Sequence, residues 1–493
     1  MRKMDESQAT SLLGASWLES GMKSTLAQRA AKGSLRVYKE YWPSDGVSVD
    51  ITGTCSRNRS SNAEEVIDFS SNDYLGLARD SAQQALVVSR YQSLLSTNAT
   101  HTGTSTSASA TLGSTGSRLL SGDSHYARQL EHRLAKWHNR PSALLFNSGY
   151  DANLAVLSCL PQIDKFLFDE FAHNSLHMGM RLSLSRRSRN HDTTSASTSD
   201  KLQEQKERFR HNNVQDLRQK LLNTSKLKVL IVVESVYSMD GDVAPLREML
   251  DLAHKFGALV LVDEAHGIGV FGDDQGSNSR GTGVLTQLHL ENHPALACSV
   301  HTFGKAAGCH GAVVCGSNTL RQYLWNYAWP LVYSTSLPLH SLVAIECSYE
   351  SMTSSRGKAL RLYTQNLVSF FRTLVQEYII DRQRQQSNSS NNNDNDNNHQ
   401  RLLYLLPSMS PIQALVLPQN GNQACTQFCE HVWQKSNQTI RLYPIKSPTV
   451  PVGKERIRII LHGHNRKAQV QRLVECMAQS LVAMNLMPPT AKL

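Results

Sequence analysis

Two short runs of apolar residues give the clearest structural signal in the chain. Residues 229–234 and residues 259–263 consist of aliphatic side chains that end in a carboxylate, Glu234 and Asp263. A strand that is apolar on both faces is typical of a parallel sheet covered by helices on both sides. Residues 246–256, between the two runs, carry apolar residues at helical spacing. The order strand, helix, strand predicts a parallel βαβ unit.

The same alternation of strands and helices extends in both directions from this unit. A helix is expected from about residue 124 to 137, with Leu130 and Leu134 on one face. Further strands are expected at residues 66–69, 143–146, 166–169, 297–302 and 311–315. We therefore predict an α/β fold whose large domain, residues 71–340, contains a mostly parallel, doubly wound sheet.

The remaining segments differ from this domain in composition. Residues 1–70 are expected to form an N-terminal segment with a helix at 24–39, and residues 341–493 a smaller α+β domain. Three polar stretches predict flexible insertions, because they contain too few apolar residues to join a core. They are residues 96–111, 186–208 and 382–400.

Polar residues gather directly after the expected strands. In open α/β sheets, ligands bind beyond the carboxyl ends of the parallel strands. The residues at those ends are Gly149, Tyr150, His173, Glu234, Ser238, Asp263, His266, Thr302 and Lys305. So many chemically active side chains at several strand ends predict one binding site.

The lysine of this set indicates the chemistry. Lys305 lies among small residues in Thr302-Phe303-Gly304-Lys305-Ala306-Ala307-Gly308. Burial disfavours the ammonium form, and a neutral lysine amine can form a Schiff base with an aldehyde. Pyridoxal 5'-phosphate needs such a lysine and a carboxylate, here Asp263, that keeps its ring nitrogen protonated. Its phosphate needs hydroxyl and backbone N–H donors, which Thr302, Gly149 and Tyr150 offer at a strand-to-helix turn.

Each of these residues also has a purely structural interpretation. Lys305 would then be a surface lysine in a glycine-rich turn, Asp263 a helix cap and His173 a solvated loop residue. Their occurrence together favours the cofactor site. A formal G-x-G-x-x-G match at residues 267–272 does not change this, since loop-like residues follow it where a dinucleotide-binding motif requires a helix.

Composition excludes several other classes of protein. The net charge of +10 is dispersed, and no basic run interleaved with aromatic residues suggests nucleic-acid binding. No apolar run reaches the roughly 18–20 residues that a membrane span needs. The nine cysteines lack zinc-ligand spacing, so no metal site is expected. The tripeptide Ala491-Lys492-Leu493 is a conservative variant of the Ser-Lys-Leu peroxisomal address, and we expect a peroxisomal location, otherwise the cytosol.

Several motifs resemble those of a known family over roughly residues 24–480. They are Ser71-Asn72-Asp73-Tyr74-Leu75-Gly76-Leu77, Gly116-Ser117-Arg118-Leu119-Leu120-Ser121-Gly122, Glu234-Ser235-Val236-Tyr237-Ser238-Met239-Asp240-Gly241-Asp242, Val262-Asp263-Glu264-Ala265-His266-Gly267, Thr302-Phe303-Gly304-Lys305 and Tyr333-Ser334-Thr335-Ser336-Leu337-Pro338. In these motifs the chain resembles the α-oxoamine synthases, which are fold-type-I pyridoxal phosphate-dependent transferases. The resemblance implies that the protein is an enzyme of this class.

The resemblance also implies roles around the cofactor. Lys305 would hold the aldehyde and move the α-proton of the substrate, and Asp263 would pair with the ring nitrogen. His173 would stack over the ring, with His266 and Ser238 near its 3' oxygen. Glu234, Gly149, Tyr150 and Thr302 would complete the cofactor site. Ser334 and Thr335 would reach the phosphate of the neighbouring subunit, which implies a homodimer with shared active sites.

The substrate residues follow from the same resemblance. Arg458 would bind the carboxylate of the amino acid, with Asn72 and Thr449 nearby, and Arg36 would meet the acyl substrate. The motifs are most similar to those of family members that join L-alanine to pimeloyl-CoA. Family members that join glycine or serine to another acyl-CoA remain alternatives, as does a non-catalytic partner subunit. The insertion before Gly113 lies next to the acyl-binding loop, so it bears on the choice of acyl chain.

Overall fold

The structure is a computed structural model of the 493-residue chain. It describes residues 6–31, 48–49, 55–56, 66–99, 111–189, 205–272, 280–384, 403–418, 421–447 and 449–487. Arg36 and residues 491–493 lie outside these ranges, as do residues 100–110, 190–204 and 385–400 of the three expected insertions.

The larger body is built on a seven-stranded sheet with the strand order β4-β10-β9-β8-β7-β5-β6. Its strands are β4 (Ser142–Phe146), β5 (Lys165–Asp169), β6 (Lys206–Phe209), β7 (Val229–Glu234), β8 (Leu259–Asp263), β9 (Leu296–Thr302) and β10 (Ala312–Gly316). Neighbours from β6 to β9 pair in parallel, whereas β10 pairs antiparallel with both β9 and β4. The predicted mostly parallel α/β sheet is therefore confirmed.

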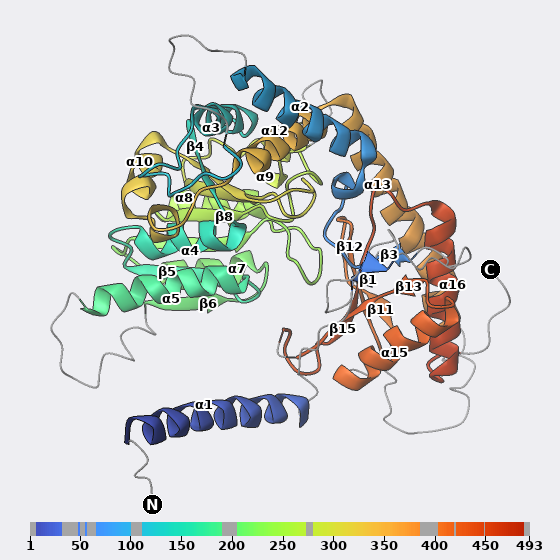
Figure 1. Cartoon of the computed structure of the whole chain (residues 1–493). Coiled ribbons are helices and arrows are strands. Elements are labelled where there is room, and N and C mark those ends of the chain that lie inside the picture. The colour runs from blue at the N-terminus through green and yellow to red at the C-terminus, as the bar shows by residue number, and fades with distance from the viewer. Residues whose placement is uncertain are drawn as a thin grey trace, which may run out of the picture.

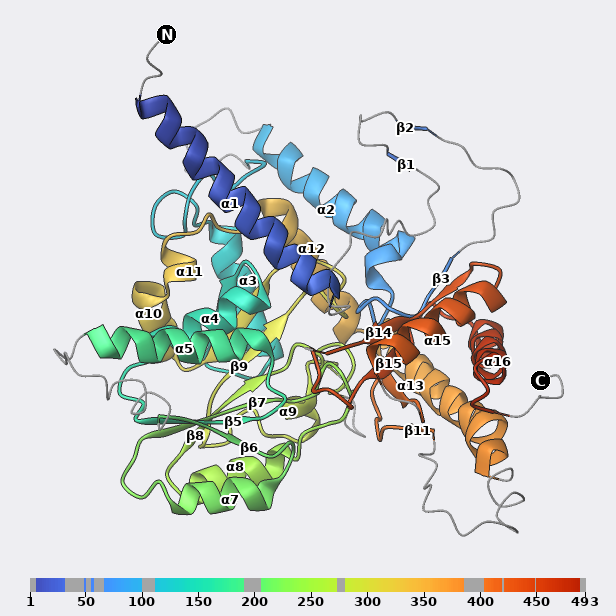
Figure 2. The ribbon, with the colours of Figure 1, turned by 90° about the horizontal axis from the view of Figure 1, so that it is seen from below.

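Helices cover both faces of this sheet, as Figure 2 shows. Leu230 and Val232 of β7 belong to the core under α4 (Gly149–Cys159) and α5 (Asn174–Arg189). Ile231 and Val233, which point the other way, belong to the core under α7 (Val214–Leu222) and α8 (Leu246–Lys255). Successive residues of one strand thus enter two cores, which explains why the run is apolar throughout.

The smaller body (Figure 1) contains a four-stranded antiparallel sheet. Its strand order is β11-β12-β15-β14. Its strands are β11 (Tyr404–Leu405), β12 (Ile412–Val416), β14 (Tyr443–Ile445) and β15 (Arg456–Ile460). Helices α13 (Ser355–Val375), α15 (Asn422–Lys435) and α16 (Lys467–Ala483) share one hydrophobic core with this sheet. The short strand β3 (Ile67–Asp68) pairs in parallel with β13 (Ile440–Arg441), so the chain before residue 70 contacts this body.

The other described elements lie outside the two sheets and the helices named above. They are α1 (Glu6–Ala31), β1 (Ser48–Val49), β2 (Cys55–Ser56), η1 (Leu77–Arg79), α2 (Ser81–Ala99), α3 (His125–Trp137), α9 (Val284–Gln287), α10 (Asn318–Tyr327), α11 (Trp329–Val332), α12 (Leu339–Thr353) and the π-helical turn η2 (Gln376–Ile380). Helix α1 stands apart from the rest of the ribbon in Figure 1, and its described side chains from Trp17 to Ala31 are exposed. Within the ranges given above, no helix is long and apolar enough to cross a membrane.

Three sequence-based boundaries need correction. The N-terminal helix was expected at residues 24–39, but α1 begins at Glu6 and the described helix ends at Ala31. Helices α2 and α5 continue to Ala99 and Arg189, inside two of the expected insertions.

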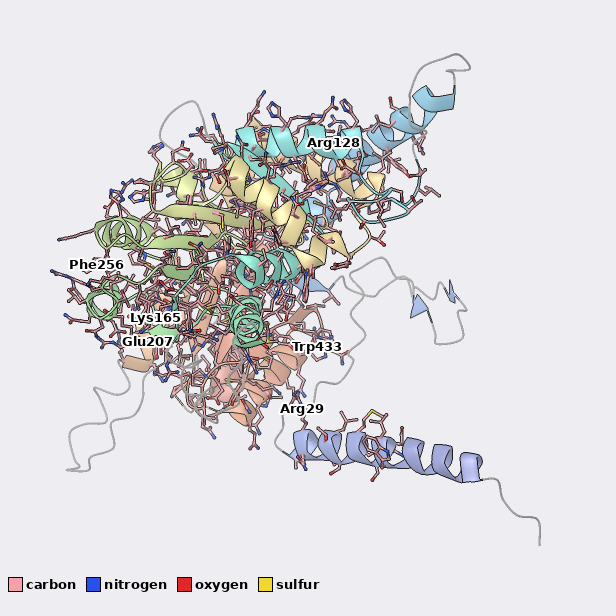
Figure 3. All side chains as sticks on the ribbon, turned by 90° about the vertical axis from the view of Figure 1, so that its left-hand side faces the viewer. Arg29, Arg128, Lys165, Glu207, Phe256 and Trp433 are labelled. Carbon is pink, nitrogen blue, oxygen red and sulfur yellow. The ribbon has the colours of Figure 1, made fainter. Side chains whose placement is uncertain are left out.

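Strand β6 begins inside the second expected insertion. It is polar because it is the sheet edge and has one neighbour; its Glu207 pairs with Lys165 of β5 at 2.6 Å (Figure 3).

Candidate active site

Lys305 lies in the turn that follows β9, at the carboxyl edge of the parallel strands. Its Nζ is 2.7 Å from Nε2 of His266, which follows β8. Burial lowers the pKa of Lys305 to about 8, although the nearby Asp263 and Glu234 carboxylates oppose the shift. A lysine with this pKa has a substantial neutral fraction near neutral pH, as the sequence predicted.

A chain of hydrogen bonds leads from Lys305 to Asn72. Burial and the Lys305 charge keep the pKa of His266 well below its usual value, so the ring is neutral and carries one N–H. If Lys305 donates to Nε2, Nδ1 of His266 donates to the Tyr74 hydroxyl at 2.6 Å. That hydroxyl in turn donates to Oδ1 of Asn72 at 3.2 Å. The chain fixes the orientation of the Lys305 amine.

Asp263, the last residue of β8, is held by two donors. Its Oδ2 accepts from Nδ2 of Asn153 at 2.7 Å, and its Oδ1 accepts from the backbone N–H of Ala265 at 2.9 Å. Asn153 lies on the buried face of α4 and also donates to the Ser175 hydroxyl at 3.0 Å. These bonds fix the direction of a carboxylate that is only 5 % exposed.

His173 and Glu234 come together next to Asp263. The backbone N–H of His173 donates to Oε1 of Glu234 at 2.7 Å, and Nδ1 of His173 is 2.8 Å from the Ser175 hydroxyl. Burial and the nearby Asp263 charge raise the pKa of Glu234 well above its usual value. His173 itself is exposed, so its ring is accessible to a bound molecule.

The turn between β4 and α4 forms a cradle beside Thr302. Gly149 is the first residue of α4, and the Ser148 side chain caps this helix by accepting from the backbone N–H of Asp151. A Cβ atom at Gly149 would lie 3.0 Å from Cβ and 3.1 Å from Oγ1 of Thr302. Only glycine leaves this close approach free, next to a helix N-terminus that favours anions. Tyr150 follows and is 42 % exposed.

Ser334 and Thr335 lie beside the same turn in this chain. Nδ2 of Asn147 donates to the Ser334 hydroxyl at 3.0 Å and to the backbone carbonyl of Thr335 at 2.8 Å. Asn147 immediately precedes the cap residue Ser148. Their predicted contact with a neighbouring subunit stays a prediction.

Arg458 of β15 contacts two other predicted site residues. Its Nε donates to the backbone carbonyl of Ser238 at 2.8 Å, and its Nη2 donates to Oδ1 of Asn72 at 2.8 Å. Arg458 therefore joins the smaller body to the end of the His266–Tyr74–Asn72 chain. Thr449 is exposed and its described hydrogen bond is a backbone one to Lys446. Arg36 lies outside the described residues.

Three functional side chains were missed by sequence reasoning. Asn153 and Ser175 orient Asp263 and His173, and Tyr74 orients His266. An asparagine among the apolar residues of an expected helix was a usable signal, because a buried amide needs a specific partner. Tyr74 and Ser175 carried no such signal, since their partners are more than a hundred residues away or in a loop.

The functional groups in this site fit the predicted cofactor. A partly buried lysine with a lowered pKa, a buried and doubly hydrogen-bonded carboxylate and a glycine cradle at a helix N-terminus lie at one sheet edge. Those are the groups that bind, respectively, an aldehyde, a protonated ring nitrogen and a phosphate.

The fold and this arrangement define a fold-type-I transferase of the α/β class. The chain belongs to the aminotransferase class I and II family, whose model matches residues 64–476. It is 35 % identical over 444 residues to 8-amino-7-oxononanoate synthase of Emericella nidulans, covering 87 % of this chain and 93 % of that protein. The predicted family resemblance is thereby confirmed.

Two solved structures show the same fold. Sphingomonas wittichii serine palmitoyltransferase has a TM-score of 0.67 at 22 % identity, covering 96 % of this chain and 98 % of that one. The 8-amino-7-oxononanoate synthase of Francisella tularensis has a TM-score of 0.60 at 23 % identity, covering 85 % and 99 %. Both likenesses confirm the predicted fold class.

Proposed function

We propose that this protein is a pyridoxal phosphate-dependent C-acyltransferase that condenses L-alanine with pimeloyl-CoA. The products would be 8-amino-7-oxononanoate, coenzyme A and carbon dioxide, a step of biotin biosynthesis. Sequence support comes from the Emericella nidulans relative, which is 35 % identical over most of both chains. The observation that carries the proposal is the 2.7 Å contact between Lys305 Nζ and His266 Nε2, next to a buried Asp263.

Bound in this site, pyridoxal phosphate would supply an aldehyde that captures an amino group and a protonated ring that accepts an electron pair. Asp263 would hold the ring nitrogen, because Asn153 and Ala265 N–H already direct its carboxylate. Gly149 and Thr302 would hold the phosphate at the N-terminus of α4. The exposed ring of His173 would cover one face of the cofactor.

Lys305 is the base in this proposal. With a pKa of about 8, its amine is partly neutral at physiological pH and can take the α-proton of alanine. The neutral His266 accepts a hydrogen bond from Nζ and so directs the amine lone pair without adding a second positive charge. The guanidinium of Arg458 would bind the carboxylate of the amino acid, since a planar fork matches a carboxylate. Arg36 would meet the distal carboxylate of the acyl chain.

A homodimer and a peroxisomal location complete the proposal. Support for the homodimer comes from the resemblance of the Tyr333–Pro338 motif to the family, in which Ser334 and Thr335 would reach the phosphate of the neighbouring subunit. Ala491-Lys492-Leu493 supports import into peroxisomes.

The test is release of coenzyme A by the purified, cofactor-loaded protein across a matrix of acyl-CoAs and amino acids. We expect turnover with pimeloyl-CoA only when L-alanine is present. Equal or better turnover with glycine and a short acyl-CoA, or with serine and palmitoyl-CoA, would contradict the substrate assignment. Lys305→Ala should abolish both turnover and the visible absorbance of the bound cofactor, whereas Lys255→Ala, at the end of α8, should change neither. A cofactor band without turnover for any pair would indicate a non-catalytic subunit.

A further inference from the structure

A histidine outside the site described above lies between two carboxylates. Nδ1 of His211 is 2.8 Å from Oδ1 of Asp169, and its Nε2 is 2.7 Å from Oδ2 of Asp242. An ionised carboxylate only accepts hydrogen bonds, so both ring nitrogens must donate. Only the imidazolium form has two N–H groups. The geometry therefore requires a positively charged His211 when both aspartates are ionised.

Both carboxylates also accept hydrogen bonds from Asn212, the residue that follows the histidine. The backbone N–H of Asn212 donates to Asp169 at 2.8 Å, and Nδ2 of Asn212 donates to Asp242 at 2.5 Å. The backbone N–H of Phe171 donates to Asp169 at 2.9 Å. Asp169 is fully buried, so loss of the imidazolium would leave a buried charge with fewer partners.

Aromatic rings fix the imidazole between these carboxylates. The ring of Phe171 stacks on His211 with centroids 4.4 Å apart, and the ring of Tyr237 meets it edge-on at 4.5 Å. The residues that face His211 therefore come from the loop after β5 and from the turn after β7. The loop and the turn together hold the imidazole in one orientation.

The remaining charged groups around His211 are mostly acidic. The carboxylate of Glu170 accepts from the backbone N–H of His211 at 2.9 Å. The carboxylate of Asp240 lies within 4.8 Å of the His211 and Asp242 atoms, and it forms an ion pair with Arg456 of β15. Arg456 brings a positive charge to this group, but that charge is already paired with Asp240. The surrounding charge favours the imidazolium.

Each aspartate belongs to a segment that carries part of the active site. Asp169 ends β5, and four residues later the same loop presents His173, whose N–H is bound by Glu234. The backbone carbonyl of Asp242 closes the turn after β7, because it accepts from the backbone N–H of Tyr237 at 3.1 Å. That turn also presents the Ser238 carbonyl to Arg458. His211 joins the two segments.

We propose that His211 is a positioning residue that, as an imidazolium shared by Asp169 and Asp242, fixes the His173 loop against the Ser238 turn. Burial alone would lower the pKa of His211, but the hydrogen bonds and charges of both aspartates outweigh it and raise the pKa to about 9. We call the hydrogen-bonded group Asp169–His211–Asp242 the clasp. Both of its hydrogen bonds are therefore made at neutral pH, and one is lost as the pH rises through about 9. Its effect on rate rests on the proposed function, whereas its protonation and its effect on the bound cofactor do not.

The test compares three variants of the full-length, cofactor-loaded protein. His211→Phe keeps a ring between Phe171 and Tyr237 but removes both N–H donors. Asp242→Asn keeps the shape of the clasp and removes one negative charge. The matched control is His293→Phe, because His293 forms another histidine–aspartate pair, 3.1 Å from the exposed Asp251, and belongs to neither of these two segments.

Three readouts are measured: the His211 pKa by NMR of histidine-labelled protein, the visible circular dichroism of the bound cofactor, and the pH profile of coenzyme A release. We expect a His211 pKa near 9 in the unmodified protein and a lower one in Asp242→Asn. We expect His211→Phe to alter the cofactor dichroism and to lower kcat about a hundredfold with little change in KM, because small displacements of reacting groups have effects of this size. Asp242→Asn should move the alkaline limb of the profile to lower pH and leave the acid limb in place. His293→Phe should match the unmodified protein.

Either of two results would overturn the proposal. One is a His211 pKa at its ordinary value. The other is that the cofactor dichroism, kcat and the alkaline limb of the pH profile are unchanged in both His211→Phe and Asp242→Asn. The clasp would then be merely structural, even if the variants had a lower melting temperature. If His211→Phe does not fold, Asp242→Asn decides the question by the same readouts. A third outcome is that NMR and dichroism give the expected results while the protein is inactive with every acyl-CoA. That outcome would refute the proposed function and leave the clasp supported.

Discussion

Nδ2 of Asn153 donates a hydrogen bond to Oδ2 of Asp263 at 2.7 Å. Asn153 lies on α4, the helix that begins with the phosphate cradle, and Asp263 ends β8 at the proposed ring-nitrogen site. One helix therefore sets both the position of Gly149 and the direction of the Asp263 carboxylate. The bond is buried, and hydrogen bonds to buried charged groups are worth about 1.5–3 kcal/mol. Asn153 would thus support the proposed cofactor site by orienting Asp263.

We expect Asn153→Ala to weaken pyridoxal phosphate binding about tenfold or more, because a charge-assisted hydrogen bond to Asp263 is lost. Equilibrium dialysis or the visible absorbance of the bound cofactor measures this. The control is Asn326→Ala, whose amide donates to the Gln322 carbonyl at an exposed position of α10. Equal cofactor affinity in both variants would show that the bond has no role.

Gly149→Ala should also weaken cofactor binding, by about tenfold, since an added Cβ lies 3.0 Å from Thr302 Cβ and displaces that side chain from the cradle. Gly113→Ala is the matched control, because no atom lies within 4 Å of a Cβ built there. Titration of both apo-variants with pyridoxal phosphate gives the comparison. An affinity for Gly149→Ala equal to that of the control would argue against the cradle.

Arg458→Lys should raise KM for L-alanine about tenfold to a hundredfold and change KM for the acyl-CoA much less. A lysine offers a point charge in place of the planar fork that binds a carboxylate, and it cannot keep both the Ser238 and Asn72 contacts. Steady-state kinetics with each substrate varied separately measures the effect. Arg356→Lys, which alters an exposed ion pair with Asp80, should leave both KM values unchanged. A rise confined to the acyl-CoA KM would reassign Arg458 to the other substrate.

Acidification should destabilise the folded protein through buried histidines. Burial lowers the pKa of His138 to about 3 and keeps the pKa of His301 well below its usual value. Below about pH 6.5 the unfolded chain binds protons that the folded chain does not, so stability is lost as pH falls. Each such histidine contributes a slope of about 1.4 kcal/mol per pH unit. His211 has the opposite sign: its raised pKa stabilises fully below about pH 6.5, and that contribution is lost as pH rises through about 9.

Urea unfolding at about pH 7 and about pH 5.5 measures the acid slope. His301→Leu should reduce the slope by the share of one histidine, since it removes a buried ring whose Nδ1 has no hydrogen-bond partner among the described residues. His132→Leu, at an exposed position of α3, is the control and should leave the slope unchanged. An identical slope in the two variants would mean that His301 titrates normally in the folded state.

The peroxisomal proposal has a direct test. A fluorescent protein fused before residue 1 should co-localise with a peroxisomal marker, and removal of Ala491-Lys492-Leu493 should leave the fusion in the cytosol. Replacement of Lys492 by Glu in the tripeptide is a second variant that keeps its length. The same distribution for all three proteins would refute the proposal.

The sequence predicted the strands that bear chemistry because local physics decides them. The residues at 229–234 and 259–263 are apolar on both sides, and a strand buried between two helical layers requires that pattern. The predicted cofactor-site residues followed from it, because Asp263, Thr302 and Lys305 come at or just after strand ends and parallel strands end at one edge.

What the sequence could not provide are the partners that arrive from elsewhere in the chain. Asn72 meets Arg458 across 386 positions, and Tyr74 meets His266 across 192. Such pairings depend on how the two bodies pack, which no local pattern records. Strand β6 was missed for another reason: an edge strand has one neighbour and tolerates the charged residues Lys206, Glu207 and Arg208, which read as an insertion.

Strand β15 presents two arginines two positions apart, and both act on the turn after β7. Arg456 pairs with Asp240, while Arg458 binds the Ser238 carbonyl and Asn72. Residues at i and i+2 of a strand point to the same face of the sheet, so one face of the smaller sheet is attached at two points to a single turn of the larger body. Any closing movement of one body onto the other must therefore rotate about these two contacts or break them. In the proposed function the carboxylate of the amino acid would bind Arg458. The same arginine would then take part in substrate binding and in the contact about which the two bodies would move.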